Sequence, residues 1–186
     1  MIGSATAQRM RRRSFSLLRV RVRPCHRTSG LLLAGPHALS VMLGRSGVRA
    51  NKLEGDGATP RGCFRLLRVW WRGDRHLRPP TLLPVRRISP DLAWCEDPAD
   101  PRYNRPFRRS TGEMGDRLWR QDGLYDLVIE IDHNCRPRVT GRGSGVFLHI
   151  ARPGRSPTAG CVALTKEDLR RLLARVGRKT RIAIGA

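Results

Sequence analysis

A histidine and a cysteine twelve residues apart carry the clearest chemistry in this sequence. The segment Phe147–Leu164 reads F-L-H-I-A-R-P-G-R-S-P-T-A-G-C-V-A-L, with His149 near the end of one apolar run and Cys161 just before another. Acyl transfer by cysteine needs a thiolate, an imidazole that takes its proton, and backbone N–H groups facing the developing oxyanion. The pattern makes Cys161 a candidate nucleophile, His149 a candidate base, and the amides around Gly160 and Cys161 candidate oxyanion donors. Spacing alone also fits a structural role for both side chains.

The other cysteines do not suggest a second kind of site. The chain has five, an odd number at wide intervals, and no two have C-x-x-C spacing. Cys25 lies beside His26, and Cys135 lies two residues from His133, but neither pair has the second half of a metal site. The sequence therefore predicts no disulfide scaffold, no metal and no cofactor.

Regular elements must hold His149 and Cys161 in place. Gly145 to Ile150 is a nearly continuous apolar run and predicts a buried strand that carries His149. After Cys161, a helix is predicted over Thr165–Val176, because Thr165 is a good N-cap and leucines recur at helical spacing. Gly177 stands where the chain should leave that helix.

The remaining apolar segments predict a mainly β domain of the α+β class, with six or seven strands and one clear C-terminal helix. The other expected strands are Leu18–Arg23, Leu31–Ala34 and Ala38–Leu43 as a hairpin, Cys63–Trp71, a short edge strand in Leu82–Ile88, Tyr125–Asp132, and Thr180–Ile184. In the first of these, apolar residues alternate with arginines, which places the arginines on a solvated face. The absence of βαβ alternation excludes a Rossmann fold or an α/β barrel.

A long middle segment is harder to assign. Ser89 to Arg109 is rich in Pro, Asp and Arg and predicts a long irregular excursion. Ser110 and Glu113 have capping-box spacing, so a short helix is predicted within Ser110–Trp119. The tryptophans Trp70, Trp71 and Trp119 are predicted to be core residues.

The charge of the chain is strongly positive. Its 186 residues include 37 Lys and Arg against 15 Asp and Glu, a formal net charge of +22, and eleven of the basic residues precede the first acidic one, Glu54. This excess suits a polyanion such as nucleic acid, an anionic membrane surface or a cell-wall polymer, although GC-rich coding also produces arginine excess. Residues 1–16 are expected to form a basic, weakly ordered tail. No apolar run is long enough to span a membrane.

Several segments resemble one known family. T-A-G-C-V-A-L around Cys161 resembles the Ser/Thr-x-Gly-Cys signature of the L,D-transpeptidase (YkuD-type) catalytic domain. The stretch E-G-D-G-A-T-P-R-G at Glu54–Gly62 resembles the family's early loop, and Leu124–Asn134 and Gly141–His149 extend the similarity. The resemblance implies a single YkuD-like β-sandwich or β-roll catalytic domain over residues 17–186.

The resemblance also implies an activity. Cys161 matches the family's nucleophile, which attacks the carbonyl of the third residue of a peptidoglycan tetrapeptide and releases the terminal D-alanine. His149 matches the general acid/base, and Gly160 with Thr158 matches the residues that shape the nucleophile's loop. The implied partners are peptidoglycan stem peptides and an anionic cell-wall polymer, and we expect a monomer in the cell envelope.

The chain departs from the family pattern at two positions near the nucleophile. Many members carry a histidine where this chain has Ala159, and an arginine or asparagine where it has Ala163. Arg152 or Arg155 could hold the substrate carboxylate instead, because a guanidinium pairs a carboxylate through two hydrogen bonds. The resemblance also suggests further pocket residues, although a structural role remains the alternative for each: Tyr125, Asn134 and Arg142.

Two other functions remain open. A hydrolytic relative, such as an L,D-carboxypeptidase or a wall peptide hydrolase, would use the same Cys161 and His149. A basic nucleic-acid-binding module is disfavoured, because Phe15 is the one aromatic residue among residues 1–53 and such modules stack bases on aromatic rings. The N-terminus has no standard export signal, which leaves unconventional export, a start at Met10 or later, or action on cytoplasmic precursors and recycled fragments.

Overall fold

The computed structural model describes residues 14–185, and its first strand follows the alternating pattern of the sequence. In β1 (Leu17–Arg23), Leu18 and Val20 are fully buried and the arginines between them are exposed, as predicted. β1 pairs antiparallel with β2 (His26–Ala34) and parallel with β14 (Arg181–Ile184). Phe15 packs against the same core, so ordered contacts reach two residues before the expected domain boundary. The rest of the expected tail, residues 1–13, lies outside the described residues.

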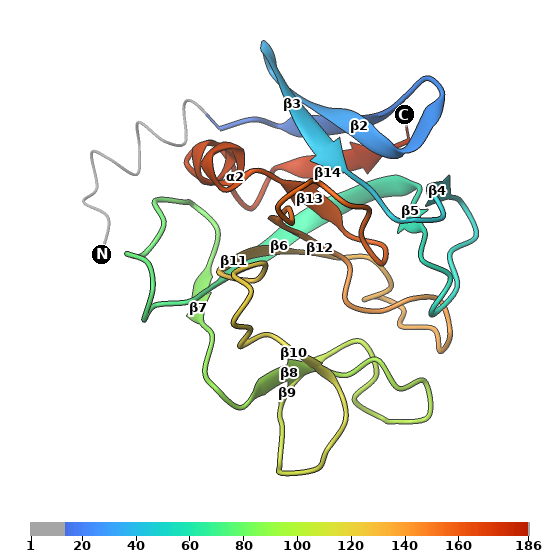
Figure 1. Cartoon of the computed structure of the whole chain (residues 1–186), viewed down its shortest axis with the longest axis vertical. Coiled ribbons are helices and arrows are strands. Elements are labelled where there is room, and N and C mark those ends of the chain that lie inside the picture. Colours follow the sequence, from blue (N-terminus) through green and yellow to red (C-terminus); the bar gives the residue numbers. More distant parts are fainter. Residues whose placement is uncertain (1–13, 186) are drawn as a thin grey trace.

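The main sheet closes on itself. Its order is β11-β12-β13-β3-β2-β1-β14-β6-β7, and β6 also pairs with β11, so the first eight strands form a ring that we call the closed roll (Figure 1). The closure links residues far apart in the chain, because β6 pairs antiparallel with both β14 and β11. The remaining strands of this sheet and of the small pair β4–β5 are β3 (His37–Met42), β4 (Val48–Arg49), β5 (Thr59–Pro60), β6 (Gly62–Trp71), β7 (Val85–Arg87), β11 (Leu127–Ile131), β12 (Phe147–Ile150) and β13 (Val162–Leu164).

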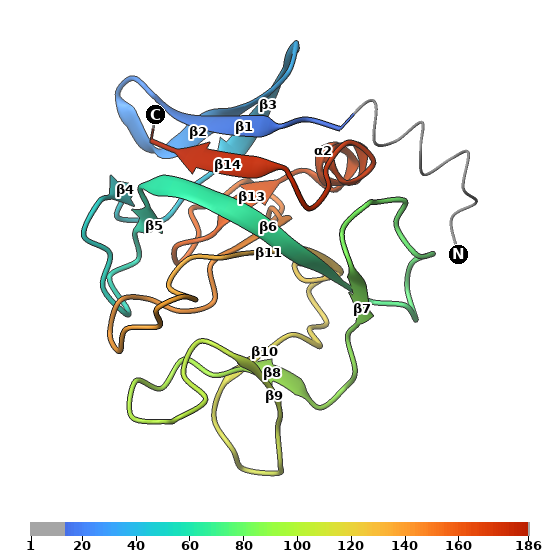
Figure 2. The ribbon, with the colours of Figure 1, turned by 180° about the vertical axis from the view of Figure 1, so that it is seen from behind.

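The described residues contain one α-helix, and its leucines belong to the apolar core inside the closed roll. α2 (Lys166–Leu173) begins as predicted, with Thr165 as N-cap accepting a hydrogen bond from the Asp168 N–H at 3.1 Å. It buries its leucine face and lies beside the start of β14 (Figure 2). The helix ends at Leu173, before the predicted Val176, because the chain tightens into a turn in which the Arg175 N–H donates to Leu172 O. The fold is mostly β and forms a single domain.

The predicted helix within Ser110–Trp119 is wrong. The Ser110 N–H donates to the Glu113 carboxylate at 2.9 Å, so one bond of the capping box forms, but no helix follows it. Gly112 and Gly115 have φ angles of +82° and +145°, outside the helical region, and stop its propagation. The segment instead contributes β10 (Asp116–Arg117), which pairs with β8 (Leu92–Trp94).

The middle excursion is therefore more ordered than its composition indicated. β8 lies between β10 and β9 (Pro106–Arg108) in a small antiparallel sheet. Turns and loops make up most of the rest of the segment. Figure 1 shows this sheet set apart from the closed roll, below β11.

A second apolar cluster fills the space between the small sheet and the outer wall of the closed roll. It contains Trp70, Trp94, Val128, Phe147 and Cys161. β11 is consequently buried on both faces, since Val128 belongs to this cluster while its neighbours in sequence face the interior of the roll. The excursion thus builds one wall of the region around the candidate nucleophile.

The three predicted core tryptophans all pack against apolar clusters, although Trp71 and Trp119 are only half-buried. Trp70 is buried, and its indole N–H donates to Glu130 at 2.8 Å. Trp119 borders the second cluster and stacks with Arg72, whose guanidinium carbon is 3.6 Å from the ring centroid. Trp71 packs against the roll interior. Within residues 14–185, no helix has both the length and the apolar character required to cross a membrane.

Candidate active site

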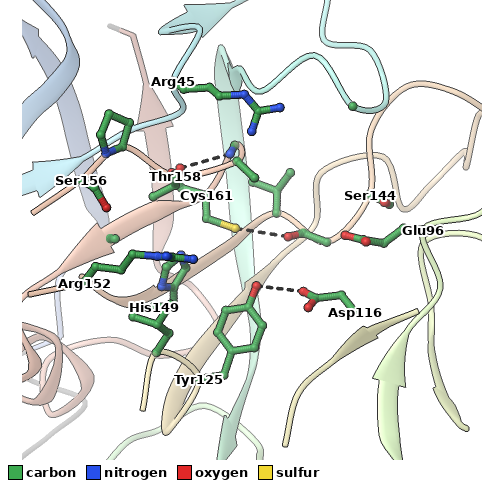
Figure 3. Close-up of a pocket in the computed structure, with 18 of the residues that line it drawn as sticks. Arg45, Glu96, Asp116, Tyr125, Ser144, His149, Arg152, Ser156, Thr158 and Cys161 are labelled. Carbon is green, nitrogen blue, oxygen red and sulfur yellow. Dashed lines mark hydrogen bonds between the residues drawn. The ribbon is translucent and has the colours of Figure 1, made fainter. Parts of the chain in front are cut away.

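Two adjacent parallel strands place His149 and Cys161 at the same cavity. β12 and β13 pair in parallel with His149 opposite Ala163, and Cys161 is the residue directly before β13. Along β12, Leu148 points into the closed roll, whereas Phe147 contacts the second cluster and His149 lines the cavity. The cavity has a volume of about 370 Å³, and Figure 3 shows His149 and Cys161 on its wall.

The cysteine is a buried free thiol. Its side chain is 8% exposed, the Sγ–H donates to Gly145 O at 3.3 Å, and Sγ accepts from the Phe147 N–H at 3.4 Å. Burial raises the pKa of Cys161 to about 12. The resting site therefore holds a protonated thiol, and a nucleophilic thiolate requires a base.

His149 has the protonation state that a base needs. Its Nδ1 lies 2.8 Å from Ile150 O, and because a carbonyl oxygen only accepts hydrogen bonds, Nδ1 carries the proton and Nε2 keeps its lone pair. Burial lowers the pKa of His149 to about 4, so the ring is neutral near pH 7. Tyr125 packs edge-on against the imidazole, with ring centroids 5.3 Å apart.

Tyr125 is itself held by Asp116. The phenol O–H donates to Asp116 Oδ2 at 2.9 Å, and Arg120 lies over the Tyr125 ring with its guanidinium carbon 5.0 Å from the centroid. Burial raises the pKa of the Tyr125 phenol well above its ordinary value, which keeps the donor protonated. The small sheet, through β10, therefore orients the ring that supports His149 (Figure 3).

Thr158 and Gly160 shape the loop before the nucleophile. The Thr158 hydroxyl donates to Cys161 O at 2.7 Å and accepts from the Gly160 N–H at 3.1 Å. Thr59 adds a weaker hydrogen bond to the same Cys161 carbonyl at 3.4 Å. Since the Gly160 N–H already has an acceptor, the Cys161 N–H is the better candidate of the two amides for an oxyanion donor.

Gly160 occupies a position that suits no other residue. Its φ is +148°, and a Cβ there would lie 3.0 Å from Ala58 O. We expect Gly160→Ala to destabilise the fold by about 1–3 kcal/mol and to reduce turnover sharply, because the nucleophile's loop must shift. Thermal unfolding and steady-state kinetics on the same preparation measure both effects.

Gly154→Ala is the matched control for this substitution. Gly154 lies in the same connection, has a φ of +76°, and a Cβ on it would meet nothing within 4 Å. It therefore carries the backbone strain without the contact with Ala58. Equal losses of activity in both variants would show that the fit of Gly160 against Ala58 is unimportant.

The two arginines proposed for the substrate carboxylate differ in position, because one lines the cavity and the other does not. Arg152 lines the cavity and lies next to His149 in Figure 3. Arg155 is exposed and is not among the residues that line the cavity. The alanines that replace polar family residues, Ala159 and Ala163, both line the cavity, so its other walls must supply the polar groups.

Of the three further pocket residues that the resemblance suggested, only one lines the cavity. Tyr125 lines the cavity. Asn134 does not, and instead braces a loop by donating to Val139 O and Gly143 O, each at 2.9 Å. Arg142 hydrogen-bonds to the Asn51 side chain, away from the cavity lining.

Charged residues from distant segments complete the cavity, and of these the sequence identified Arg152 alone as a candidate site residue. Positive charges come from Arg45, Lys52, Arg120 and Arg152, and negative charges come from Glu54, Glu96 and Asp116. Burial, together with neighbouring carboxylates, raises the pKa of Glu96 to about 7. Lys52 and Asp56 are four residues apart, but this spacing indicates an ion pair only on a helix, and here it lies in a loop. No local pattern marked Glu96 or Asp116 either.

The described part of the chain contains no group of three or more His, Cys, Asp or Glu residues arranged to hold a metal ion. The cavity contains both a buried thiol and a neutral imidazole, the two groups that cysteine enzymes use for covalent catalysis.

Comparison with protein families agrees with this arrangement. The model of the L,D-transpeptidase catalytic domain, YkuD, matches residues 27–184. The chain therefore belongs to the YkuD family of L,D-transpeptidase catalytic domains, as the sequence resemblance predicted. Searches of curated proteins and of solved structures find no match.

Proposed function

We propose that this protein is a peptidoglycan L,D-transpeptidase that works through a thioester on Cys161. Its donor is a stem tetrapeptide, the leaving group is the terminal D-alanine, and the acceptor is an amine. The observation that carries the proposal is the presentation of Cys161 and a neutral His149 at one cavity by adjacent strands. Family membership supports the substrate class.

His149 and Cys161 can account for every proton transfer that the proposed acyl transfer requires. His149 Nε2 takes the proton of the Cys161 thiol as sulfur attacks the carbonyl carbon of the third stem residue, and the Cys161 N–H stabilises the resulting oxyanion. Collapse of this intermediate breaks the peptide C–N bond, and the imidazolium returns the proton to the departing D-alanine amine. The acceptor amine then attacks the thioester and gives a proton to His149, which passes it to the departing thiolate.

The charges of the cavity suit substrates with both carboxylates and amines. Arg152 is available to a substrate carboxylate through two hydrogen bonds. On the other side, Glu96 and Asp116 form an anionic wall that favours an approaching ammonium group. Because the pKa of Glu96 is raised to about 7, this carboxylate can accept a proton from the acceptor near neutral pH. This wall favours an amine acceptor over water.

Product analysis tests the proposal directly. The purified protein is incubated with a tetrapeptide muropeptide donor and a muropeptide amine acceptor, and the products are identified by mass spectrometry. We expect cross-linked dimers together with released D-alanine. Tripeptide as the sole product would assign the hydrolytic alternative, an L,D-carboxypeptidase, and no cleavage of the donor would contradict the proposed substrate class.

The outer face of the closed roll supports an anionic cell-wall polymer as a partner. β1, β6 and β14 present a row of exposed arginines that form no ion pair within residues 14–185: Arg19, Arg21, Arg23, Arg65 and Arg181. No Phe, Tyr or Trp side chain is paired with this row, which disfavours base stacking and hence nucleic acid. We place the protein in the cell envelope as a monomer, with residues 17–186 as its catalytic domain.

A further inference from the structure

Lys52 is a buried lysine at the candidate active site to which neither the family match nor the proposed reaction gives a role. Its side chain is 5% exposed and lines the cavity that contains Cys161. The ammonium donates to Asp56 Oδ1 at 2.7 Å and to Leu53 O at 3.1 Å. An ammonium has three N–H donors, so one remains for the cavity.

Two glycines leave the space that the Lys52 side chain occupies. A Cβ on Gly143 would lie 2.9 Å from Lys52 Cε, and a Cβ on Gly160 would lie 3.5 Å from Lys52 Nζ. The first position leaves room for the aliphatic stem, and the second brings the ammonium against the residue before Cys161. The cation is thus fixed close to the backbone that carries the nucleophile.

The ion pair points its positive end at the cavity. Lys52 lines the cavity, whereas Asp56 is not among the lining residues. Asp56 is tied behind the lysine by the Leu53 N–H at 3.0 Å and the Ala58 N–H at 2.8 Å. Its charge therefore weakens the field of the ammonium at Cys161 without reversing it, because the carboxylate lies farther from the cavity.

We propose that Lys52 is a positioning residue whose fixed ammonium stabilises negative charge at Cys161, first on the thiolate and then on the oxyanion. Lys52 keeps its proton throughout and forms no bond to the substrate carbon. The inference rests on the proposed role of Cys161 as nucleophile. Lys52 also acts to lower the pKa of Cys161, against the effects of burial and of the carboxylates of Asp116 and Glu96.

Other charged groups also face the lysine or the thiol. His133 lies close to Gly143 on the side of the lysine stem, and burial lowers its pKa, which keeps it neutral. Glu96 and Asp116 line the cavity and oppose formation of the thiolate, and Glu54 lines it while accepting a hydrogen bond from the Tyr103 hydroxyl. None of these groups is altered in the experiment below, so the Lys52–Asp56 pair is tested against a constant background.

Thiol reactivity without substrate tests the inference. The rate of alkylation of Cys161 by iodoacetamide is measured between pH 7 and 9 on the full chain, with mass spectrometry of the Cys161 peptide to separate it from the other cysteines. At a fixed pH this rate reports the thiolate population. We expect Lys52→Met to lower it by roughly fivefold or more and Asp56→Asn to raise it, since the second variant removes the opposing charge.

The opposite signs distinguish an electrostatic role from a structural one. Both substitutions break the same ion pair, so a merely structural role shifts the reactivity of Cys161 in the same direction in both variants, and that result would overturn the inference. If Lys52→Met fails to fold, Asp56→Asn decides alone, because a rate equal to or below that of the wild type contradicts the proposal. Lys179→Met, at an exposed lysine before β14, is the matched control and should leave the rate unchanged.

The assay separates this inference from the proposed function. It contains no stem peptide, so the alkylation rates are obtained whether or not the protein transfers acyl groups. Absence of muropeptide products would contradict the proposed substrate class and leave the effect of Lys52 on the thiol standing. If muropeptide products form normally but the alkylation rate changes in the same direction in both variants, the proposed role of Lys52 is rejected and the proposed function stands.

Discussion

Cys161→Ala is expected to abolish formation of the thioester with a tetrapeptide donor and to reduce turnover by about a thousandfold or more. Cys161 is the one cysteine among the residues that line the cavity with His149. Intact-protein mass spectrometry after mixing with donor detects the covalent adduct. Kinetics of D-alanine release measure the accompanying loss of turnover.

Cys63→Ser is the matched control for this substitution. Cys63 is an exposed free thiol on β6, on the outer face of the closed roll, and it is not among the residues that line the cavity. This variant should form the adduct at the wild-type rate. An adduct that persists in Cys161→Ala, or that is lost in Cys63→Ser, would remove Cys161 from its assigned role.

His149→Ala is expected to lower kcat/KM by about 100- to 10,000-fold, the usual contribution of a general base. The pH dependence gives a sharper test. Activity requires the neutral ring, and since the pKa of His149 is lowered to about 4 by burial, the acid limb of the wild-type profile should fall near pH 4. An unperturbed histidine would place that limb near pH 6.5.

The direction of this shift follows from the solvation of the ring. Burial removes water from the imidazolium and so disfavours the protonated form, which means that the base remains competent until the pH falls through about 4. His37→Ala, at an exposed position on β3, should leave the profile unchanged. Unchanged turnover of His149→Ala across neutral pH would exclude this residue as the base.

Local patterns were sufficient for the elements in which one face is buried and the other is solvated. β1 alternates arginines with fully buried residues, and the cap at Thr165 with the leucines of α2 marks the start of the helix. The hairpin of β2 and β3 follows from two apolar runs separated by Gly35, whose φ of +58° suits the turn. In each case the decisive contacts lie within a few residues along the chain.

Local patterns failed where distant contacts decide the backbone. Ser110 and Glu113 form their capping bond, but Gly112 and Gly115 interrupt the helix and β10 pairs with β8 instead. On β11, Glu130 is polar and yet buried, because Trp70 and Arg68 pair with its carboxylate. These outcomes depend on partners that a short window of sequence does not contain.

The mainly β class, the family and the candidate pair His149 and Cys161 could be predicted from the sequence, since the two residues are close in the chain and flanked by recognisable strands. What surrounds that pair depends on contacts between distant segments. Lys52 comes from the loop before β5 and Asp116 from β10, and they line one cavity because β6 closes the roll against β11 while the small sheet packs on its outer wall. The desolvation that makes His149 neutral and Cys161 a protonated thiol is a property of this packing, which no local spacing encodes.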